Sequence, residues 1–271
     1  MKALLWSVMG ILFFSSCNPG PKHPQADLVK QNDVMTMSAQ EILNYADSID
    51  ASLPALTKES SLVFKITPDE SLFVDQYRNN GQQTVCYIEH TTSAGISEIT
   101  STYYLKNDSI LLVRRRQTQL KNGLTQFSDQ RSFLRNNIVF KTEEKSGPDS
   151  SSLARQSFSE KKNPQDKTLN PYAEKIAMFK DALAGVNKFE LVFDKLVQLP
   201  DARHLLLKGK IPNGYSASIL VEEPDLLIDS LQNDPRHFNA RKLNFNWEVE
   251  DHEAVYVPVA ANLTSAKGLN K

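Results

Sequence analysis

The chain has 271 residues, of which 40% are hydrophobic and 23% are charged, so it can bury a core, and its length suggests about two domains. The charges of its 31 basic and 32 acidic residues nearly cancel. If the N-terminal segment that contains Lys2 is cleaved off, 30 basic residues (31 − 1) remain against 32 acidic ones. A net charge this close to zero excludes a protein that is drawn to nucleic acid or anionic lipid by its overall charge.

The first 17 residues predict export from the cytoplasm. The positive charge of Lys2 is followed by the apolar run 3–14 and by the small residues Ser15 and Ser16, which is the pattern of a signal peptide. A transmembrane helix needs ~20 apolar residues to cross a bilayer core of ~30 Å, so this run is too short to be a membrane-spanning anchor.

The residues Phe14-Ser15-Ser16-Cys17 resemble the lipobox of bacterial lipoproteins, in which the cysteine is acylated and becomes the mature N-terminus. The resemblance implies that lipid on Cys17 holds the protein at a membrane of the bacterial cell envelope. In some lipoproteins an acidic cluster after the lipidated cysteine acts as a surface-export signal. No such cluster follows Cys17, so a periplasm-facing position at the outer membrane is favoured. The alternative is an ordinary secretory peptide with an incidental cysteine.

The cysteine count limits how the folded part is stabilised. If Cys17 carries the lipid, Cys86 is the only other cysteine, and no intramolecular disulfide can form. Cys86 lies in the middle of a predicted strand, and a two-residue turn at Asn80-Gly81 places it opposite Asp75. His90 is about 13 Å further along the same face, too far to activate a nucleophile, so we expect Cys86 to be a small core residue.

Residues 18–37 are rich in proline and polar residues without an apolar period, so we expect a flexible tether. A helix should begin after Ser38, because Ser38 and Glu41 have the spacing of a capping box. Apolar residues then recur at helical spacing up to Leu53-Pro54, and the apolar face of this helix should cover a sheet. The residues of that face are Ile42, Tyr45, Ala46 and Ile49.

Residues 38–144 are predicted to form a first domain, in which this helix packs on the concave side of a long, curved antiparallel β-meander. Asn80-Gly81 and Asn122-Gly123 are favoured sequences for two-residue hairpin turns, and Asn107-Asp108 and Asn136-Asn137 tolerate the same geometry. The predicted strands are Leu62–Thr67, Leu72–Asn79, Gln82–His90, Ser97–Lys106, Ser109–Lys121, Gln126–Arg135 and Ile138–Glu144.

Arg114, Arg115 and Arg116 are the residues of the meander that are most suggestive of a binding site, since three arginines can hold an acidic ligand. If Asn122-Gly123 closes a two-residue turn, Arg116 lies opposite Asp129. The turn at Asn107-Asp108 would place Arg116 opposite Ile99 and Arg115 opposite Thr100, with Glu98 diagonal to Arg116. Charge pairs of this kind are typical of a solvated sheet face, which is therefore the favoured interpretation.

Residues 145–169 are rich in Ser, Lys, Pro, Asp and Gln, so we interpret them as a linker before a second domain at 170–265, with a C-terminal tail at 266–271. Asn170 and Pro171 can cap a second helix that ends near Gly185. After it, strands are predicted at Lys188–Leu199, His204–Ile211 and Tyr215–Glu222, a helix at Pro224–Gln232, and strands at Leu243–Glu250 and Val255–Ala261.

This order of three strands, a helix and two strands resembles an OB-fold barrel over Lys188–Leu263, with a small mixed sheet as the alternative. OB domains bind ligands on the second and third strands, where His204, Lys208, Lys210 and Tyr215 lie. With only one stacking aromatic among them, nucleic acid is disfavoured. Trp247 could be a stacking platform, but a core residue is the favoured interpretation, and the run 248–253 lacks the second histidine that a metal site would need.

No nucleophile motif, P-loop, dinucleotide fingerprint or HExxH pair occurs in the sequence, so no catalytic, cofactor or metal residue is assigned. The sequence therefore favours a mainly β, lipid-anchored envelope protein that binds or scaffolds another envelope component, a protein or a glycan. A carrier of an apolar ligand, similar in outline to the outer-membrane lipoprotein carriers, is the second hypothesis. A hydrolase is the third.

Overall fold

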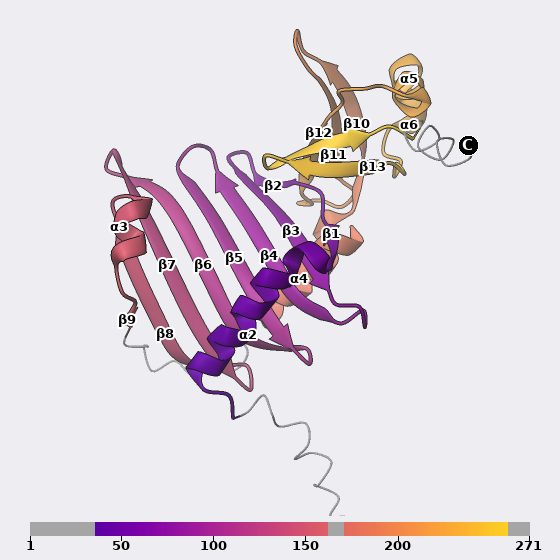
Figure 1. Cartoon of the computed structure of the whole chain (residues 1–271). Coiled ribbons are helices and arrows are strands. Elements are labelled where there is room, and N and C mark those ends of the chain that lie inside the picture. Colours follow the sequence, from indigo (N-terminus) through magenta and orange to yellow (C-terminus); the bar gives the residue numbers. More distant parts are fainter. Residues whose placement is uncertain (1–35, 162–170, 260–271) are drawn as a thin grey trace, which may run out of the picture. The chain divides into compact units, whose positions relative to one another are not determined.

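The computed structural model describes residues 36–161 and 171–259. The predicted signal peptide, Cys17, nearly all of the predicted tether, residues 162–169 of the predicted linker and the C-terminal tail lie outside the described residues. The predicted mainly β class is confirmed, because the described strands belong to one large sheet that does not close into a barrel (Figure 1).

The first part of the chain supplies the meander. Its strands are β1 (Thr57–Ser60), β2 (Phe64–Thr67), β3 (Glu70–Arg78), β4 (Thr84–Ser93), β5 (Ser97–Lys106), β6 (Ser109–Lys121), β7 (Leu124–Arg135), β8 (Ile138–Gly147) and β9 (Ser159–Glu160). The helices beside them are α2 (Ala39–Ser52), the short 3₁₀ helix η2 (Leu53–Ala55) and α3 (Ser150–Arg155). From β2 to β9 each strand pairs with the next one antiparallel, as predicted for a meander.

The predicted first helix is confirmed. The hydroxyl of Ser38 accepts a hydrogen bond from the Glu41 amide at 3.3 Å, and the Glu41 carboxylate accepts one from the Ser38 amide at 2.7 Å. Ile42 and Ala46 are fully buried against the sheet. The capping box and the apolar face therefore position α2 as the sequence predicts.

Three of the four predicted turns are confirmed, and a β-bulge changes the register after one of them. Both central residues of the turns at 107–108, 122–123 and 136–137 have positive φ. Arg116 lies opposite Asp129, as predicted. The prediction that Arg116 faces Ile99 and Arg115 faces Thr100 is wrong, because Leu111 is an extra residue between the pairs Leu105↔Ile110 and Tyr104↔Leu112. Arg116 therefore lies opposite Thr100, and Arg115 opposite Ser101.

The predicted two-residue turn at Asn80-Gly81 is also wrong. The loop is longer, since Arg78 pairs with Thr84, and the Asn79 side-chain oxygen accepts hydrogen bonds from the amides of Gly81 and Gln83. As a result Cys86 lies opposite Tyr77 instead of Asp75. Cys86 is fully buried and free, and burial raises the pKa of its thiol, as expected for a core residue.

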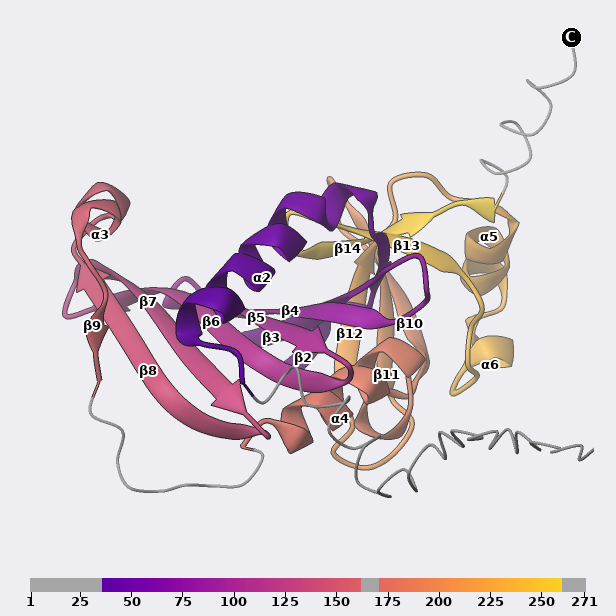
Figure 2. The same cartoon turned by 60° about the horizontal axis from the view of Figure 1, so that its bottom comes forward.

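The two faces of the sheet carry different helices (Figure 2). Asp50 of α2 bonds to the Tyr104 hydroxyl, whereas Phe179 of α4 (Ala173–Ala184) packs against Tyr103, the neighbouring residue on β5. Successive residues of a strand point to opposite faces, so α2 and α4 cover opposite sides. We call them the α2 face, which carries Tyr104, and the α4 face, which carries Tyr103.

The second part of the chain extends the same sheet. Its strands are β10 (Leu191–Gln198), β11 (Arg203–Gly209), β12 (Ser216–Leu220), β13 (Asn246–Glu250) and β14 (Glu253–Val257). Its helices are α4, η3 (Asn187–Phe189), α5 (Leu226–Asn233) and α6 (Pro235–Phe238). Strand β12 pairs with β2, so the strands of the predicted domains 38–144 and 170–265 belong to one sheet. The interpretation of residues 145–169 as a linker is wrong in part, because this segment contains all of α3, all of β9 and the last residues of β8.

The predicted strands and helix occur in the predicted order, with the additional short helix α6 between α5 and β13, but the predicted OB-like barrel is wrong. Strand β14 pairs with β12 in parallel and with β13 antiparallel. Among the described strands no pairing joins β10 to β13, and β12 instead bonds to β2 of the meander. The hydrogen bonds of β12 thus continue the long sheet, which stays open.

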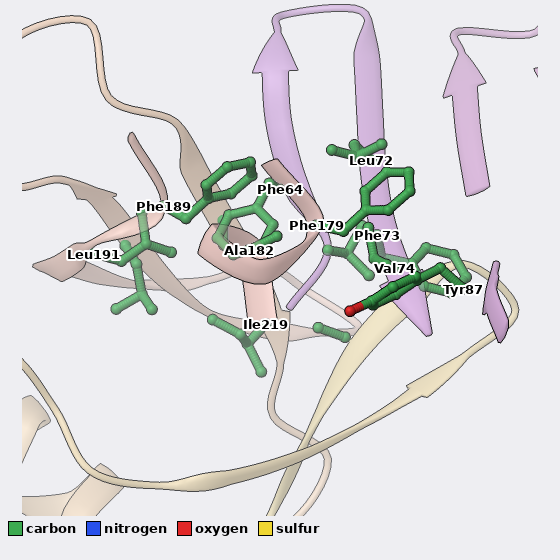
Figure 3. Close-up of a cluster of buried hydrophobic side chains, with 14 of the residues drawn as sticks. Phe64, Leu72, Phe73, Val74, Tyr87, Phe179, Ala182, Phe189, Leu191 and Ile219 are labelled. Atoms are coloured by element: carbon green, nitrogen blue, oxygen red, sulfur yellow. The ribbon is translucent and has the colours of Figure 1, made fainter. Parts of the chain in front are cut away.

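A single apolar core joins α4 to both parts of the sheet (Figure 3). Phe179 and Ala182 of α4 are at most 2% exposed, and the Phe179 ring lies 5.0 Å from the Tyr103 ring. The Phe64 ring of β2 lies edge-on to the Phe189 ring at 4.7 Å. One core therefore connects α4 with the meander and with the second group of strands.

Candidate functional site

The arginine run lies at the centre of two polar pockets, one on each face of the sheet. Arg114 and Arg116 point to the α2 face, and Arg115 points to the α4 face, because neighbouring strand residues alternate. The α2-face pocket has a volume of about 280 Å³ and the α4-face pocket about 440 Å³. All three arginines line the α2-face pocket, but the Arg115 side chain points to the other face, so three guanidiniums do not converge on one anion site.

On the α2 face, Arg114 fastens α2 to the sheet. Its guanidinium donates hydrogen bonds to Asp47 at 2.5 Å and to Asp50 at 2.7 Å, and it lies over the Tyr104 ring at 5.2 Å. The Tyr104 hydroxyl donates to Asp50 at 2.8 Å. Arg114 is only 16% exposed, so we assign it a structural role in holding the helix.

The other charges of the α2-face pocket are also balanced within the protein. Arg116 lies 3.7 Å from Asp129 and is 78% exposed, as expected for a solvated pair. Arg131 lies under the Phe158 ring at 3.6 Å. Burial and the nearby charge of Arg114 lower the pKa of Arg131, while surrounding carboxylates act in the opposite direction. Because each cation has acidic neighbours, this pocket offers little net charge to a ligand.

The α4-face pocket differs, since its cationic side chains are not all paired. It lies where the first turn of α4 crosses strands β3 to β7. Its walls carry hydroxyl, amide, carboxylate and tyrosine groups. The lining residues are Glu70, Glu89, Thr91, Ile99, Ser101, Tyr103, Val113, Arg115, Gln130, Ser132, Pro171, Tyr172 and Lys175.

Glu89 organises the buried side of this pocket. It is 5% exposed, and it accepts hydrogen bonds from the Tyr103 hydroxyl at 2.9 Å and from the Lys175 ammonium at 2.6 Å. Burial, followed by the neighbouring Glu89 carboxylate, raises the pKa of Tyr103, so this hydroxyl stays protonated and donates. Tyr103 and Lys175 thus satisfy Glu89, which is a poor candidate for free acid–base chemistry.

Arg115 and Lys175 are both exposed cations of the pocket, but Lys175 pairs with Glu89 and Arg115 does not. Among the described residues no carboxylate lies within ion-pair distance of it, and its neighbours across the strands are Ser101 and Gln130. A guanidinium presents five N–H donors in a planar fork that matches carboxylate geometry. Arg115 is therefore free to bind an external acceptor.

The other residues proposed from the sequence do not join either polar pocket. Lys208 pairs with Asp194 at 3.0 Å, and Lys210 with Glu190 at 2.8 Å. The Tyr215 ring packs edge-on against Phe189 at 4.9 Å. Trp247 is partly buried and lies 5.8 Å from the Phe245 ring, at a separate apolar pocket.

The acidic turn at 248–253 contacts the sheet. The His252 ring lies 5.8 Å from the His90 ring and 5.7 Å from Phe73, and its Nε2 lies 3.5 Å from Glu98. Within residues 36–161 and 171–259 no group of three His, Cys, Asp or Glu side chains is placed to hold a metal ion. In the same ranges no helix has the length and apolarity to cross a membrane.

Sequence reasoning missed Glu89, Tyr103 and Lys175, which come from strands and a helix far apart in the chain. One contact of the site could have been predicted, because the turn that pairs Arg116 with Asp129 also pairs Arg115 with Gln130. Comparisons with protein-family models, curated proteins and solved structures found no match to this chain.

Proposed function

We propose that the chain is a lipid-anchored protein of a bacterial cell envelope that binds another envelope component without chemical conversion. The α4-face pocket is the proposed recognition site, and the unpaired guanidinium of Arg115 is the observation that carries the proposal. The mixture of hydroxyls, amides and tyrosine rings favours a polar partner, and a glycan fits this lining better than an apolar protein surface.

The second hypothesis, a carrier of an apolar ligand in the curved sheet, receives less support. A carrier needs an open apolar cavity on the face that α2 covers. Ile42 and Ala46 are fully buried on that face, and Tyr45 donates a hydrogen bond to the Leu105 carbonyl at 2.6 Å. These contacts support a structural role for α2.

The proposed anchor is tested at Cys17. Acyl chains contribute ~0.8 kcal/mol per buried CH₂, so the protein should stay membrane-bound through high-salt washing, which removes proteins held by charge. Cys17→Ser should block lipidation and give an uncleaved precursor that incorporates no labelled palmitate, whereas Cys86→Ser should change neither. A soluble wild-type protein with an unmodified Cys17 at its N-terminus would contradict the anchor.

The proposed partner is tested by capture from cells. An affinity-tagged chain is cross-linked in intact cells and purified, and bound glycans and proteins are identified beside a parallel purification from a deletion strain. We expect one envelope component to be enriched reproducibly. A chain that carries lipid but enriches no component in repeated experiments would contradict the binding function and leave the anchor standing.

A further inference from the structure

A third pocket, which is apolar, lies where α4 ends, between the meander and the second group of strands. It has a volume of about 250 Å³ and is separate from the α4-face pocket. Strands β2, β10 and β11, the last turn of α4 and the segment 242–247 enclose it. The lining residues are Leu62, Phe64, Ala182, Leu183, Ala184, Gly185, Phe189, Leu191, Leu207, Lys242, Leu243, Asn244, Phe245 and Trp247.

The floor of this apolar pocket is part of the protein core. Phe64, Phe189, Leu191 and Leu207 are each at most 7% exposed. The rim is formed by side chains that are only partly buried, among them Trp247. A preformed apolar cavity with a rigid floor favours an apolar group over water, because water needs polar partners.

Two of the lining residues, Lys242 and Asn244, carry polar side chains. Lys242 is exposed, and among the described residues it has no carboxylate within ion-pair distance. The carbonyl end of α4 also lines the pocket, and there Gly185 takes a left-handed conformation and its amide donates to the Ala182 carbonyl. A helix C-terminus carries partial negative charge, so an anionic group is favoured at Lys242 and disfavoured at the helix end.

We propose that the apolar pocket binds a small anionic amphiphile, a medium-chain carboxylate, with its tail on the core floor and its carboxylate at Lys242. A volume of 250 Å³ holds roughly eight water-sized groups at ~30 Å³ each, which matches a chain of about eight carbons. This site does not depend on the proposed recognition of an envelope component in the α4-face pocket.

Trp247 makes the binding directly measurable. The chain has two tryptophans, so the full chain with Trp6→Phe and Cys17→Ser retains Trp247 as its only one and carries no lipid that could compete. This protein is titrated with octanoate, with the uncharged 1-octanol and with acetate while Trp247 emission is followed. We expect a saturable change with octanoate, at least fivefold weaker binding of octanol, and no response to acetate.

Variants at two exposed positions separate the tail from the carboxylate. Lys242→Ala should weaken octanoate binding to the level of octanol, while Lys208→Ala, which alters a lysine outside the pocket, should leave it unchanged. Ala184→Phe fills the mouth of the pocket and should abolish the response without lowering the melting temperature. The proposal is overturned if octanoate gives no saturable response, if octanol binds as tightly as octanoate, or if Lys242→Ala binds octanoate as wild type does.

Discussion

Replacement of Arg114 by alanine should loosen α2 from the sheet. A buried charge-assisted hydrogen bond contributes ~1.5–3 kcal/mol to the free energy of unfolding. The carboxylates of Asp47 and Asp50 are 65% and 40% exposed, so solvent screening reduces the contribution of each bond to ~1 kcal/mol. The guanidinium over the Tyr104 ring adds ~0.5–1 kcal/mol. The expected loss is about 2.5–3 kcal/mol, or about 5–12 °C in melting temperature for a domain of this size.

Arg116→Ala is the matched control, since Arg116 lies on the same face and strand but is 78% exposed. It should change the free energy of unfolding by no more than ~0.5 kcal/mol. Denaturant unfolding of Arg114→Ala, of Asp50→Ala and of the double variant measures the coupling between the two residues, which should be about 1 kcal/mol. Equal stabilities of Arg114→Ala and Arg116→Ala would refute the structural role of Arg114.

Three further substitutions test other parts of the fold. Phe179→Ala removes a fully buried ring of α4 and should cost ~3–5 kcal/mol in denaturant unfolding, and a loss below ~1 kcal/mol would mean that α4 does not pack as described. Asp225 caps α5 through the amides of Leu227 and Ile228 and also accepts a hydrogen bond from the Tyr256 hydroxyl, so Asp225→Ala should cost ~2 kcal/mol in the same assay, against a smaller effect of Asp229→Ala. Burial alone would raise the pKa of Asp75, but His90, Ser60 and Lys58 together lower it below the ordinary value. The Asp75 carboxylate therefore stabilises the protein above ~3.9, its pKa in the unfolded chain, and this stabilisation is lost as the pH falls through its lower pKa in the folded protein. Between pH 6 and pH 3, Asp75→Asn should consequently lose less stability than wild type. An equal loss in both proteins would contradict this assignment.

Local patterns predicted most of the elements because their causes are local. The capping box at Ser38 and the positive-φ turn at Asn122-Gly123 depend on residues within a few positions, and both are confirmed. The extra residue Leu111 could not be predicted, since a bulge is selected by packing across strands, and it shifts the register by one. The open sheet likewise depends on the pairing of β12 with β2, about 150 residues away in sequence.

The candidate site was predicted only in part for the same reason. The sequence indicated an arginine run, but alternation along β6 separates Arg115 from its two neighbours. Lys175 reaches Glu89 from a helix 86 residues further along the chain, at a distance of 2.6 Å. Convergence of this kind depends on the tertiary fold, so no spacing in the sequence indicates it.

The most direct test of the proposed function compares Arg115→Glu with Arg116→Glu in the cross-linked capture from cells. The two residues are adjacent on β6 and both exposed, and they differ in the face to which they point. The proposal predicts at least a tenfold loss of the captured envelope component for Arg115→Glu and less than a twofold change for Arg116→Glu. Equal capture by both variants, at unchanged melting temperature and lipidation, would contradict recognition through the α4-face pocket.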